Sequence, residues 1–265
     1  MADVFAGKIC IVTGGTSGIG FAVSEALLKR GATVYAVGIP AEGVKAAAKK
    51  MAGYPRARFA AVDVTDYEAV QKLVDDVVAE CGRLDYMFNN AGIGATVQFE
   101  KVTLDFWKKV VDINLWGVIH GVHAAFPVMA KQGSGHIVNT SSVAGILAPP
   151  YQAVYSATKF AVTGLTEALR YEHEYRGIAF STICPGNVAT EIFDGIEPPP
   201  DAISPAEAAG IILAGVERKE GLIIFPEHIK QLYLAVKADQ EKMDAVMRDM
   251  AETRRKAYET GGKYY

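Results

Sequence analysis

The sequence has 265 residues, of which half are hydrophobic and 22% are charged, an ordinary balance for a soluble globular protein with a substantial core. A net charge of −3 and a pI near 6.0 give no electrostatic sign of nucleic-acid binding. The three cysteines show no metal-type spacing, so we expect no disulfide framework, no metal site and a reducing, cytoplasmic location. We find no signal-peptide pattern and no run of about 18 apolar residues, and therefore expect no membrane span.

Short runs rich in valine and isoleucine alternate with longer helical patterns. Strands without clean polar alternation are typical of a parallel sheet buried on both faces. The α/β alternation predicts a doubly wound, Rossmann-like parallel sheet with helices on both faces. The expected strands span residues 8–13, 33–37, 58–62, 86–89, 136–139, 179–184 and 221–225. The expected helices span residues 19–30, 41–51, 67–81, 104–129 with interruptions near Asn114 and Pro127, and 153–175.

The pattern changes after the sixth strand. Residues 194–200 are rich in proline and predict a loop. The sequence Ser-Pro-Ala-Glu at 204–207 is a capping box with proline at the first helical position, and predicts a new helix. Over residues 226–265, apolar side chains recur at helical spacing. We expect a helix or helix pair there, extending a single domain that spans residues 1–265 and packing on it or on a partner subunit.

A glycine-rich turn, residues 13–20, follows the first expected strand and opens the first expected helix. Glycines let the backbone approach a pyrophosphate, and a helix N-terminus offers unpaired N–H groups and the positive end of its dipole. Gly14, Gly18 and Gly20 give the spacing GxxxGxG in place of GxGxxG. Such turns also serve tight packing, but the position after the first strand favours a dinucleotide site.

Tyr155 and Lys159 form a YxxxK pattern within an expected helix, so the phenol and the ammonium share one helix face. A lone YxxxK is usually a pair of surface residues. Ser142 changes this interpretation because it follows the fifth strand, at the sheet edge where ligands bind in open α/β sheets. Lowering a phenol pKa by about 3 units takes about 4 kcal/mol, which an ammonium about 4 Å away supplies at an effective dielectric near 20.

These motifs, with the Asn89-Asn90-Ala91-Gly92 sequence after the fourth strand, resemble the short-chain dehydrogenase/reductase family over roughly residues 5–225. The resemblance implies an oxidoreductase that moves a hydride between NAD(P) and a secondary alcohol or ketone. Its implied catalytic roles are proton transfer by Tyr155, lowering of the Tyr155 pKa by Lys159, a hydrogen bond from Ser142 to the substrate oxygen, and helix interruption and proton relay at Asn114. The implied coenzyme contacts are Gly14, Thr16, Ser17, Gly18, Ile19, Gly20, Gly38, Asp63, Val64, Asn90, Ala91, Gly92, Tyr155, Lys159, Pro185, Gly186, Val188 and Thr190.

The choice of coenzyme depends on the end of the second strand. An acid there would bond the ribose hydroxyls and repel a 2′-phosphate, but this chain has Gly38 at that place, followed by Ile39. The basic residues that NADP-dependent members carry at the positions of Ser17 or Ile39 are also absent. Between NAD and NADP, the missing carboxylate favours NADP.

The substrate pocket is expected to be apolar. Its expected lining residues, beside Ser142, are Ile93, Tyr151, Ile192 and Phe193, which suit a hydrophobic alcohol or ketone unless they pack on each other or on a neighbouring subunit. The family commonly assembles through its fifth and sixth helices, so a homodimer or homotetramer is expected.

Two other function classes are open. A non-catalytic dinucleotide sensor typically loses the tyrosine or the lysine, and this chain keeps both Tyr155 and Lys159. A nucleotide-sugar epimerase or dehydratase also uses YxxxK, but those relatives are usually longer and have a different glycine spacing.

Overall fold

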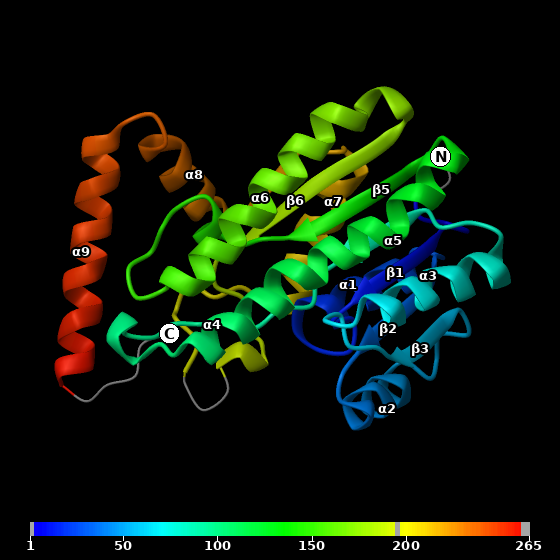
Figure 1. Ribbon diagram of the computed structural model, residues 1–265, viewed down its shortest axis with the longest axis horizontal. Coiled ribbons are helices and arrows are strands. Elements are labelled where there is room, and N and C mark those ends of the chain that lie inside the picture. Colours follow the sequence, from blue (N-terminus) through cyan, green and yellow to red (C-terminus); the bar gives the residue numbers. More distant parts are fainter. Residues whose placement is uncertain (1–2, 194–196, 261–265) are drawn as a thin grey trace.

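Seven parallel strands form one sheet with helices on both faces (Figure 1). The structure is a computed structural model, which describes residues 3–193 and 197–260 except for the side chain of Ile192. The strand order is β3-β2-β1-β4-β5-β6-β7, so the predicted doubly wound parallel sheet is confirmed. The strands are β1 (Ile9–Thr13), β2 (Thr33–Gly38), β3 (Ala57–Ala61), β4 (Tyr86–Asn89), β5 (Gly135–Thr140), β6 (Ile178–Pro185) and β7 (Leu222–Phe225).

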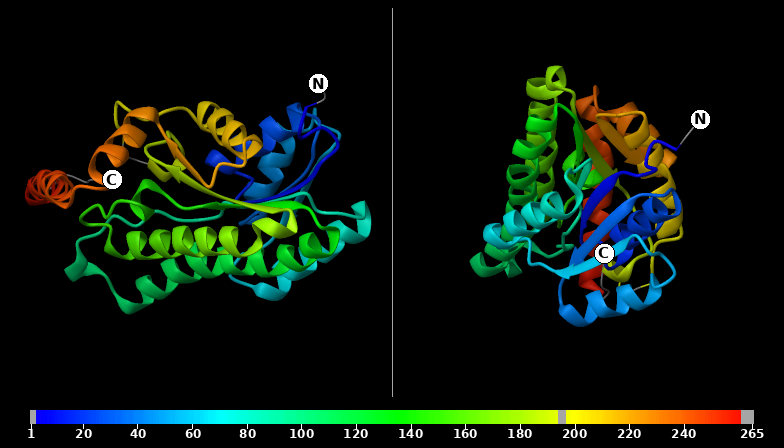
Figure 2. Two further views of the ribbon diagram at one scale, coloured as in Figure 1. Left: turned by 90° about the horizontal axis from the view of Figure 1, so that it is seen from above. Right: turned by 90° about the vertical axis from the view of Figure 1, so that its right-hand side faces the viewer.

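Two layers of helices enclose the sheet, as the rotated views show (Figure 2). Apolar side chains of α1 and α7 pack on one face, and those of α3, α5 and α6 pack on the other. The α-helices are α1 (Gly18–Lys29), α2 (Ala41–Lys50), α3 (Tyr67–Cys81), α4 (Leu104–Val111), α5 (Gly117–Gln132), α6 (Ala153–His173), α7 (Pro205–Glu217), α8 (Glu227–Val236) and α9 (Gln240–Glu259).

The strand order reverses between β1 and β4, which pair side by side at the centre of the sheet. In such sheets the crevice at the carboxyl ends of the strands, at this reversal, is where ligands bind. The glycine-rich turn follows β1 and the Asn-Asn-Ala-Gly sequence follows β4. The topology therefore brings the two motifs to the same place.

The predicted interruption at Asn114 is confirmed, and the one at Pro127 is wrong. A π-helical turn, Asp112–Trp116, separates α4 from α5, whereas α5 continues through Pro127 to Gln132. A proline removes one N–H bond, here to the carbonyl of His123, four residues earlier. Since His123 and Pro127 lie on the exposed side of α5, water can bind that carbonyl and the helix persists.

The helix predicted to start at residues 204–207 is also confirmed, and the Ser204 hydroxyl caps it by accepting a bond from the backbone N–H of Glu207 at the start of α7. The proline-rich loop predicted for residues 194–200 lies partly outside the described residues. Beyond β7 the expected helical extension is the pair α8 and α9, of which α9 stands at one end of the molecule (Figures 1 and 2).

One described helical stretch, Leu104–Gln132, is long and apolar enough to cross a membrane by length and composition alone. It comprises α4, the π-helical turn and α5, and α5 packs against the sheet through Val118, Val122 and Ala125. A buried core helix commonly passes the same test, so this feature is weak evidence for a membrane span.

Candidate active site

The glycine-rich turn approaches its neighbours too closely for side chains. A Cβ on Gly14 would lie 2.9 Å from the Cα of Ala91, and a Cβ on Gly20 would lie 2.2 Å from the carbonyl oxygen of Gly14. Gly14 and Gly18 also have positive φ angles, +62° and +50°, which other residues rarely adopt. Ser17 begins α1 without a side-chain capping bond, so the first N–H groups of the helix face the crevice without an internal acceptor.

Thr13 joins this turn to the segment after β4. Its hydroxyl oxygen accepts bonds from the backbone N–H groups of Asn90 (2.9 Å) and Ala91 (3.1 Å). The Asn90 side-chain amide donates to the carbonyl of Thr13 (3.2 Å). These bonds make one rigid floor from two motifs that are 77 residues apart in sequence.

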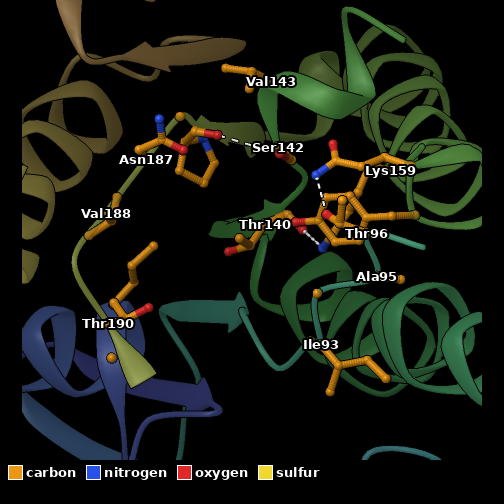
Figure 3. A pocket seen from close by; sticks show the side chains of 18 of the residues that line it. Ile93, Ala95, Thr96, Thr140, Ser142, Val143, Lys159, Asn187, Val188 and Thr190 are labelled. Carbon is orange, nitrogen blue, oxygen red and sulfur yellow. Dashed lines mark hydrogen bonds between the residues drawn. The ribbon is translucent and has the colours of Figure 1, made fainter. Parts of the chain in front are cut away.

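Tyr155 and Lys159 lie on the first two turns of α6 and face the carboxyl end of β5. The Lys159 Nζ lies 5.5 Å from the centre of the Tyr155 ring and donates to the carbonyl of Thr140 (2.9 Å). Ser142 lies two residues after the end of β5, and its hydroxyl accepts from the N–H of Ala144 (3.1 Å) and donates weakly to the carbonyl of Pro185 (3.4 Å). Figure 3 shows Thr140, Ser142 and Lys159 together at the centre of the pocket.

Asn114 lies in the π-helical turn and is fully buried. Its side-chain oxygen accepts from the N–H of Ile93 (2.8 Å), and its amide donates to the carbonyl of Ile93 (2.9 Å). A Cβ on Gly92 would lie 3.2 Å from the Asn114 oxygen and 3.5 Å from the Lys159 Nζ. Asn114 and Lys159 therefore approach the same glycine, and the wide helical turn directs the asparagine toward the site.

Burial shifts the two titratable groups in opposite directions. It lowers the pKa of Lys159 to about 8. It raises the pKa of Tyr155 above its usual value, against a smaller lowering by the hydrogen bond with Ser142. The net shift of the Tyr155 pKa is therefore opposite in direction to the lowering expected from Lys159. Burial also raises the pKa of the nearby Cys184 thiol to about 12, which keeps it neutral.

A cavity of about 1090 Å³ joins the glycine turn to the tyrosine. Of the candidate residues, it brings together Gly14, Ser17, Gly18, Ile19, Asn90, Ala91, Gly92, Ile93, Ser142, Tyr155, Lys159, Pro185, Gly186, Val188 and Thr190. On the pocket walls, Thr190 and Val188 lie opposite Ile93, Ala95 and Thr96 (Figure 3).

Other candidates lie beside the cavity. Gly20 packs under Gly14, and Asn114 acts through Ile93, as described above. Thr16 covers Gly38, since a Cβ on Gly38 would lie 2.5 Å from the Thr16 hydroxyl oxygen.

Two further candidates for coenzyme contact, Asp63 and Val64, follow the carboxyl end of β3 and do not line the cavity. Asp63 is exposed and accepts from the N–H and hydroxyl of Thr65. Val64 is buried and lies so close to Gly117 that a Cβ there would be 2.7 Å from a Val64 methyl group.

The substrate side differs most from the expectation. Ile93 lines the cavity, but Tyr151 and Phe193 do not. The Tyr151 ring instead packs on Tyr258 of α9, with centroids 5.2 Å apart, and Phe193 is 3% exposed. The side chain of Ile192 lies outside the described residues.

Several lining residues carry no sequence motif. Gln152 and Thr96 meet across the pocket wall, where the Gln152 amide donates to the Thr96 hydroxyl (2.8 Å). Met250 and Arg254 reach the cavity from α9, nearly one hundred residues after Tyr155 in sequence. In the sequence, only the recurrence of apolar side chains at helical spacing over residues 226–265 indicated a buried face there.

The cavity fits a dinucleotide. One end of the cavity is formed by the glycine turn, where Cβ atoms on Gly14 or Gly20 would clash with the backbone, and by the uncapped N-terminus of α1. This combination suits a pyrophosphate. The other end of the cavity holds a phenol, an ammonium and a hydroxyl. Among residues 3–193 and 197–260, no group of three or more His, Cys, Asp or Glu side chains could hold a metal ion.

Comparisons with known proteins agree with this geometry. The family model described as short chain dehydrogenase matches residues 8–200. The chain is 32% identical to the 3-oxoacyl-[acyl-carrier-protein] reductase of Thermotoga maritima over 88% of this chain and 92% of that protein. It is 38% identical to the D-threitol dehydrogenase of Mycolicibacterium smegmatis over 70% and 72%. The structure of LigD in its apo form from Sphingobium sp. strain SYK-6 superposes with a TM-score of 0.79 at 28% identity, over 92% and 97% of the two chains.

Proposed function

From the premise that this chain belongs to the short-chain dehydrogenase family, we propose that it transfers a hydride between NADP and an apolar secondary alcohol or ketone. Members of the family bind NAD or NADP and act on small molecules. The observation that carries the proposal is the convergence of Ser142, Tyr155 and Lys159 on the cavity that begins at the glycine turn.

Each group has a defined task in this proposal. The Ser142 hydroxyl donates a hydrogen bond to the reacting oxygen, where charge develops. Tyr155 gives its proton to that oxygen during ketone reduction and takes it back during alcohol oxidation. Lys159, held by the Thr140 carbonyl, supplies positive charge beside the phenol. The coenzyme supplies or accepts the hydride when bound, and its positive charge in the oxidised form favours the phenolate.

NADP is proposed because the second strand ends without a carboxylate. Gly38 stands there, and the Thr16 hydroxyl lies so close that a larger residue would have to displace it. The next residue, Ile39, is 59% exposed and neither repels nor attracts a 2′-phosphate. The absence of repulsion is the feature that admits NADP.

The proposed substrate is apolar because Ile93, Ala95, Val143 and Met250 line the cavity. The two relatives are named for an oxoacyl thioester and for a polyol, so a shared reaction does not fix the substrate. We further propose a cytoplasmic homo-oligomer without a membrane or nucleic-acid partner.

Replacement of the phenol tests the function. Tyr155→Phe should lower kcat for ketone reduction by about 1,000-fold or more, because the proton donor is lost. Coenzyme affinity, measured by NADPH fluorescence, should change less than about twofold. The matched control is Tyr171→Phe, because Tyr171 lies on the same helix and is 65% exposed. Its kcat and coenzyme affinity should equal those of the native chain. Undiminished turnover by Tyr155→Phe would assign proton transfer to another group.

A further inference from the structure

The C-terminal extension, defined here as residues 226–259, lies beyond the part of the chain that matches the family model. Its first helix, α8, packs on the loop after β6. A Cβ on Gly186 would lie 3.0 Å from Pro226 and 3.3 Å from Ile229. His228 also contacts the carboxylate of Asp201 (3.1 Å). The extension is thus attached to the side of the cavity that the loop after β6 forms.

The second helix, α9, contacts the opposite side. The Tyr258 ring packs on Tyr151, and its hydroxyl donates weakly to the carbonyl of Thr96 (3.4 Å). One turn earlier, the Arg254 guanidinium donates to the carbonyl of Pro150 and is 7% exposed. These contacts seat the C-terminal half of α9 on two loops, residues 94–97 and 149–152.

The two loops are joined to each other and to the catalytic helix. The N–H of Val97 donates to the carbonyl of Tyr151 (2.8 Å), and Gln152 bonds Thr96. Gln152 precedes α6 and accepts the first helical bond, from Ser156 (2.7 Å). Tyr151 has φ +65°, a conformation that is costly for a residue with a Cβ and persists only when its surroundings hold it. The stacked Tyr258 is such a surrounding group.

The extension also contributes directly to the cavity wall. Ile229 of α8 and Met250 and Arg254 of α9 line the same cavity as Ser142 and Tyr155. On α9, Met243, Met247 and Met250 are half-buried and recur on one side of the helix. Methionine adapts its shape to varied apolar partners, so this side of α9 suits an apolar ligand.

We infer that the C-terminal extension spans the active-site cleft, that α9 is the wall that selects substrates by size, and that Tyr258 is the positioning residue that holds this wall on loops 94–97 and 149–152. The inference rests on the proposed function for its substrate, but the seating of α9 is independent of catalysis. Met250 is the specificity-determining side chain of this wall, because it faces the cavity that holds Tyr155.

Hydrogen exchange tests the seating of α9 without any substrate. In Tyr258→Ala, amides of residues 94–98 and 151–153 should exchange about tenfold faster, because the Val97–Tyr151 bond opens more often. Tyr258→Phe keeps the ring contact and should restore most of the protection. Arg248→Ala is the matched control on the same helix, since Arg248 is 78% exposed and pairs only with Asp244 among the described residues. Native-like exchange in Tyr258→Ala would overturn the positioning role.

Kinetics test size selection. The probes are cyclohexanone and 1-decalone, which differ by one fused ring, with NADPH as coenzyme. Met250→Trp should raise KM for 1-decalone at least about fivefold more than it raises KM for cyclohexanone. Equal changes in KM for the two ketones would overturn the role of α9 in selecting substrates by size. Failure of the native chain to reduce any ketone would instead count against the proposed function, while the exchange experiment would still decide whether α9 is seated by Tyr258.

Discussion

At the residue scale, the site combines a buried ammonium, Lys159, and a partly buried phenol, Tyr155, with opposite pKa shifts. Burial brings the pKa of Lys159 down to about 8 and moves the pKa of Tyr155 upward. The phenol therefore stays protonated through the range in which the ammonium loses its proton. For ketone reduction this is the useful order, because the proton donor is always present and the adjacent charge alone titrates.

The pH dependence of ketone reduction follows from this order. We expect kcat/KM to fall as pH rises through about 8, since Lys159 loses its charge there. Lys159→Arg, whose guanidinium stays charged, should lack this inflection even if its rate is lower. The measurement is a profile of initial rates from about pH 6 to pH 10. A flat native profile, or an inflection near 8 that persists in Lys159→Arg, would argue against the assignment.

The same shift affects stability with a defined sign. The folded pKa of Lys159 lies below its usual 10.5, so the unfolded chain binds more protons between about pH 8 and 10.5. Stability therefore gains a contribution as pH rises through this window, whereas below pH 8 both states are protonated and burial of the ammonium opposes folding.

A charge introduced at Ile39, the exposed residue that follows Gly38, should change the proposed coenzyme preference. Ile39→Arg places a cation beside the end of β2 and should raise kcat/KM for NADPH about tenfold over the native chain, with little change for NADH. Ile39→Asp should lower kcat/KM for NADPH, whereas the uncharged control Ile39→Asn should keep it within about threefold of the native value. The comparison needs initial rates with both coenzymes. A native chain with a large preference for NADH would refute the proposed use of NADP.

Residues with fixed spacing were predictable from the sequence. Helical periodicity places Tyr155 and Lys159 on one face of α6, whereas Ser142 was identified by its position after the fifth strand and by the resemblance to the family. Gln152 and Thr96 were not predictable, because their bond joins loops 56 residues apart. Tyr151 was expected to face the substrate, but its left-handed backbone and its contact with Tyr258 turn it toward α9.

At the element scale, the π-helical turn positions a polar side chain that an α-helix would place differently. Its Asn114 satisfies both backbone groups of Ile93. The sequence indicated an interruption there, and likewise indicated one at Pro127 that does not occur. The sequence identifies residues that can interrupt a helix, such as Pro127. Whether the helix breaks there depends on whether water can reach the unpaired carbonyl of His123, and therefore on which side of the helix faces the core.

Loss of the Asn114 amide should destabilise the fold. Asn114→Ala leaves the partly buried N–H and carbonyl of Ile93 without their side-chain partner, at a cost of about 1–3 kcal/mol. Asn187→Ala is the control, because its amide bonds the exposed Asp201 and its loss should cost less than about 1 kcal/mol. Urea unfolding of the two variants gives the comparison. Equal unfolding midpoints would show that the Asn114 bonds contribute little.

At the scale of the whole molecule, the doubly wound parallel sheet and its two helical layers were predictable because seven apolar runs alternate with helical patterns, whereas the order of the strands was not predicted. The course of the C-terminal extension was not. Its apolar stripe shows that one side of each helix is covered, but nothing local specifies that Tyr258 packs on Tyr151 or that Arg254 reaches Pro150. Those contacts depend on three-dimensional proximity between segments over 100 residues apart.

The proposed assembly has a candidate surface. Trp116 and Phe160, at the start of α5 and on α6, are 48% and 44% exposed, and such side chains are favoured at interfaces. Trp116→Glu with Phe160→Glu should yield a particle of one 28.4 kDa chain by light scattering, while the native chain gives a multiple. Leu234→Glu on α8, at 46% exposure, should leave the assembly intact. A native particle of one chain would contradict the proposed oligomer.

The central claim is hydride transfer between NADP and a carbonyl carbon, and isotope transfer measures it most directly. The chain is incubated with NADPH deuterated at the transferable position and with cyclohexanone, 2-octanone, 1-decalone and a 3-ketosteroid in turn, and the products are analysed by mass spectrometry. The account predicts that at least one ketone yields an alcohol with a single deuterium on its carbinol carbon, and that Tyr155→Phe yields no such alcohol. Alcohol without deuterium, or no alcohol from any ketone with either coenzyme, would contradict it.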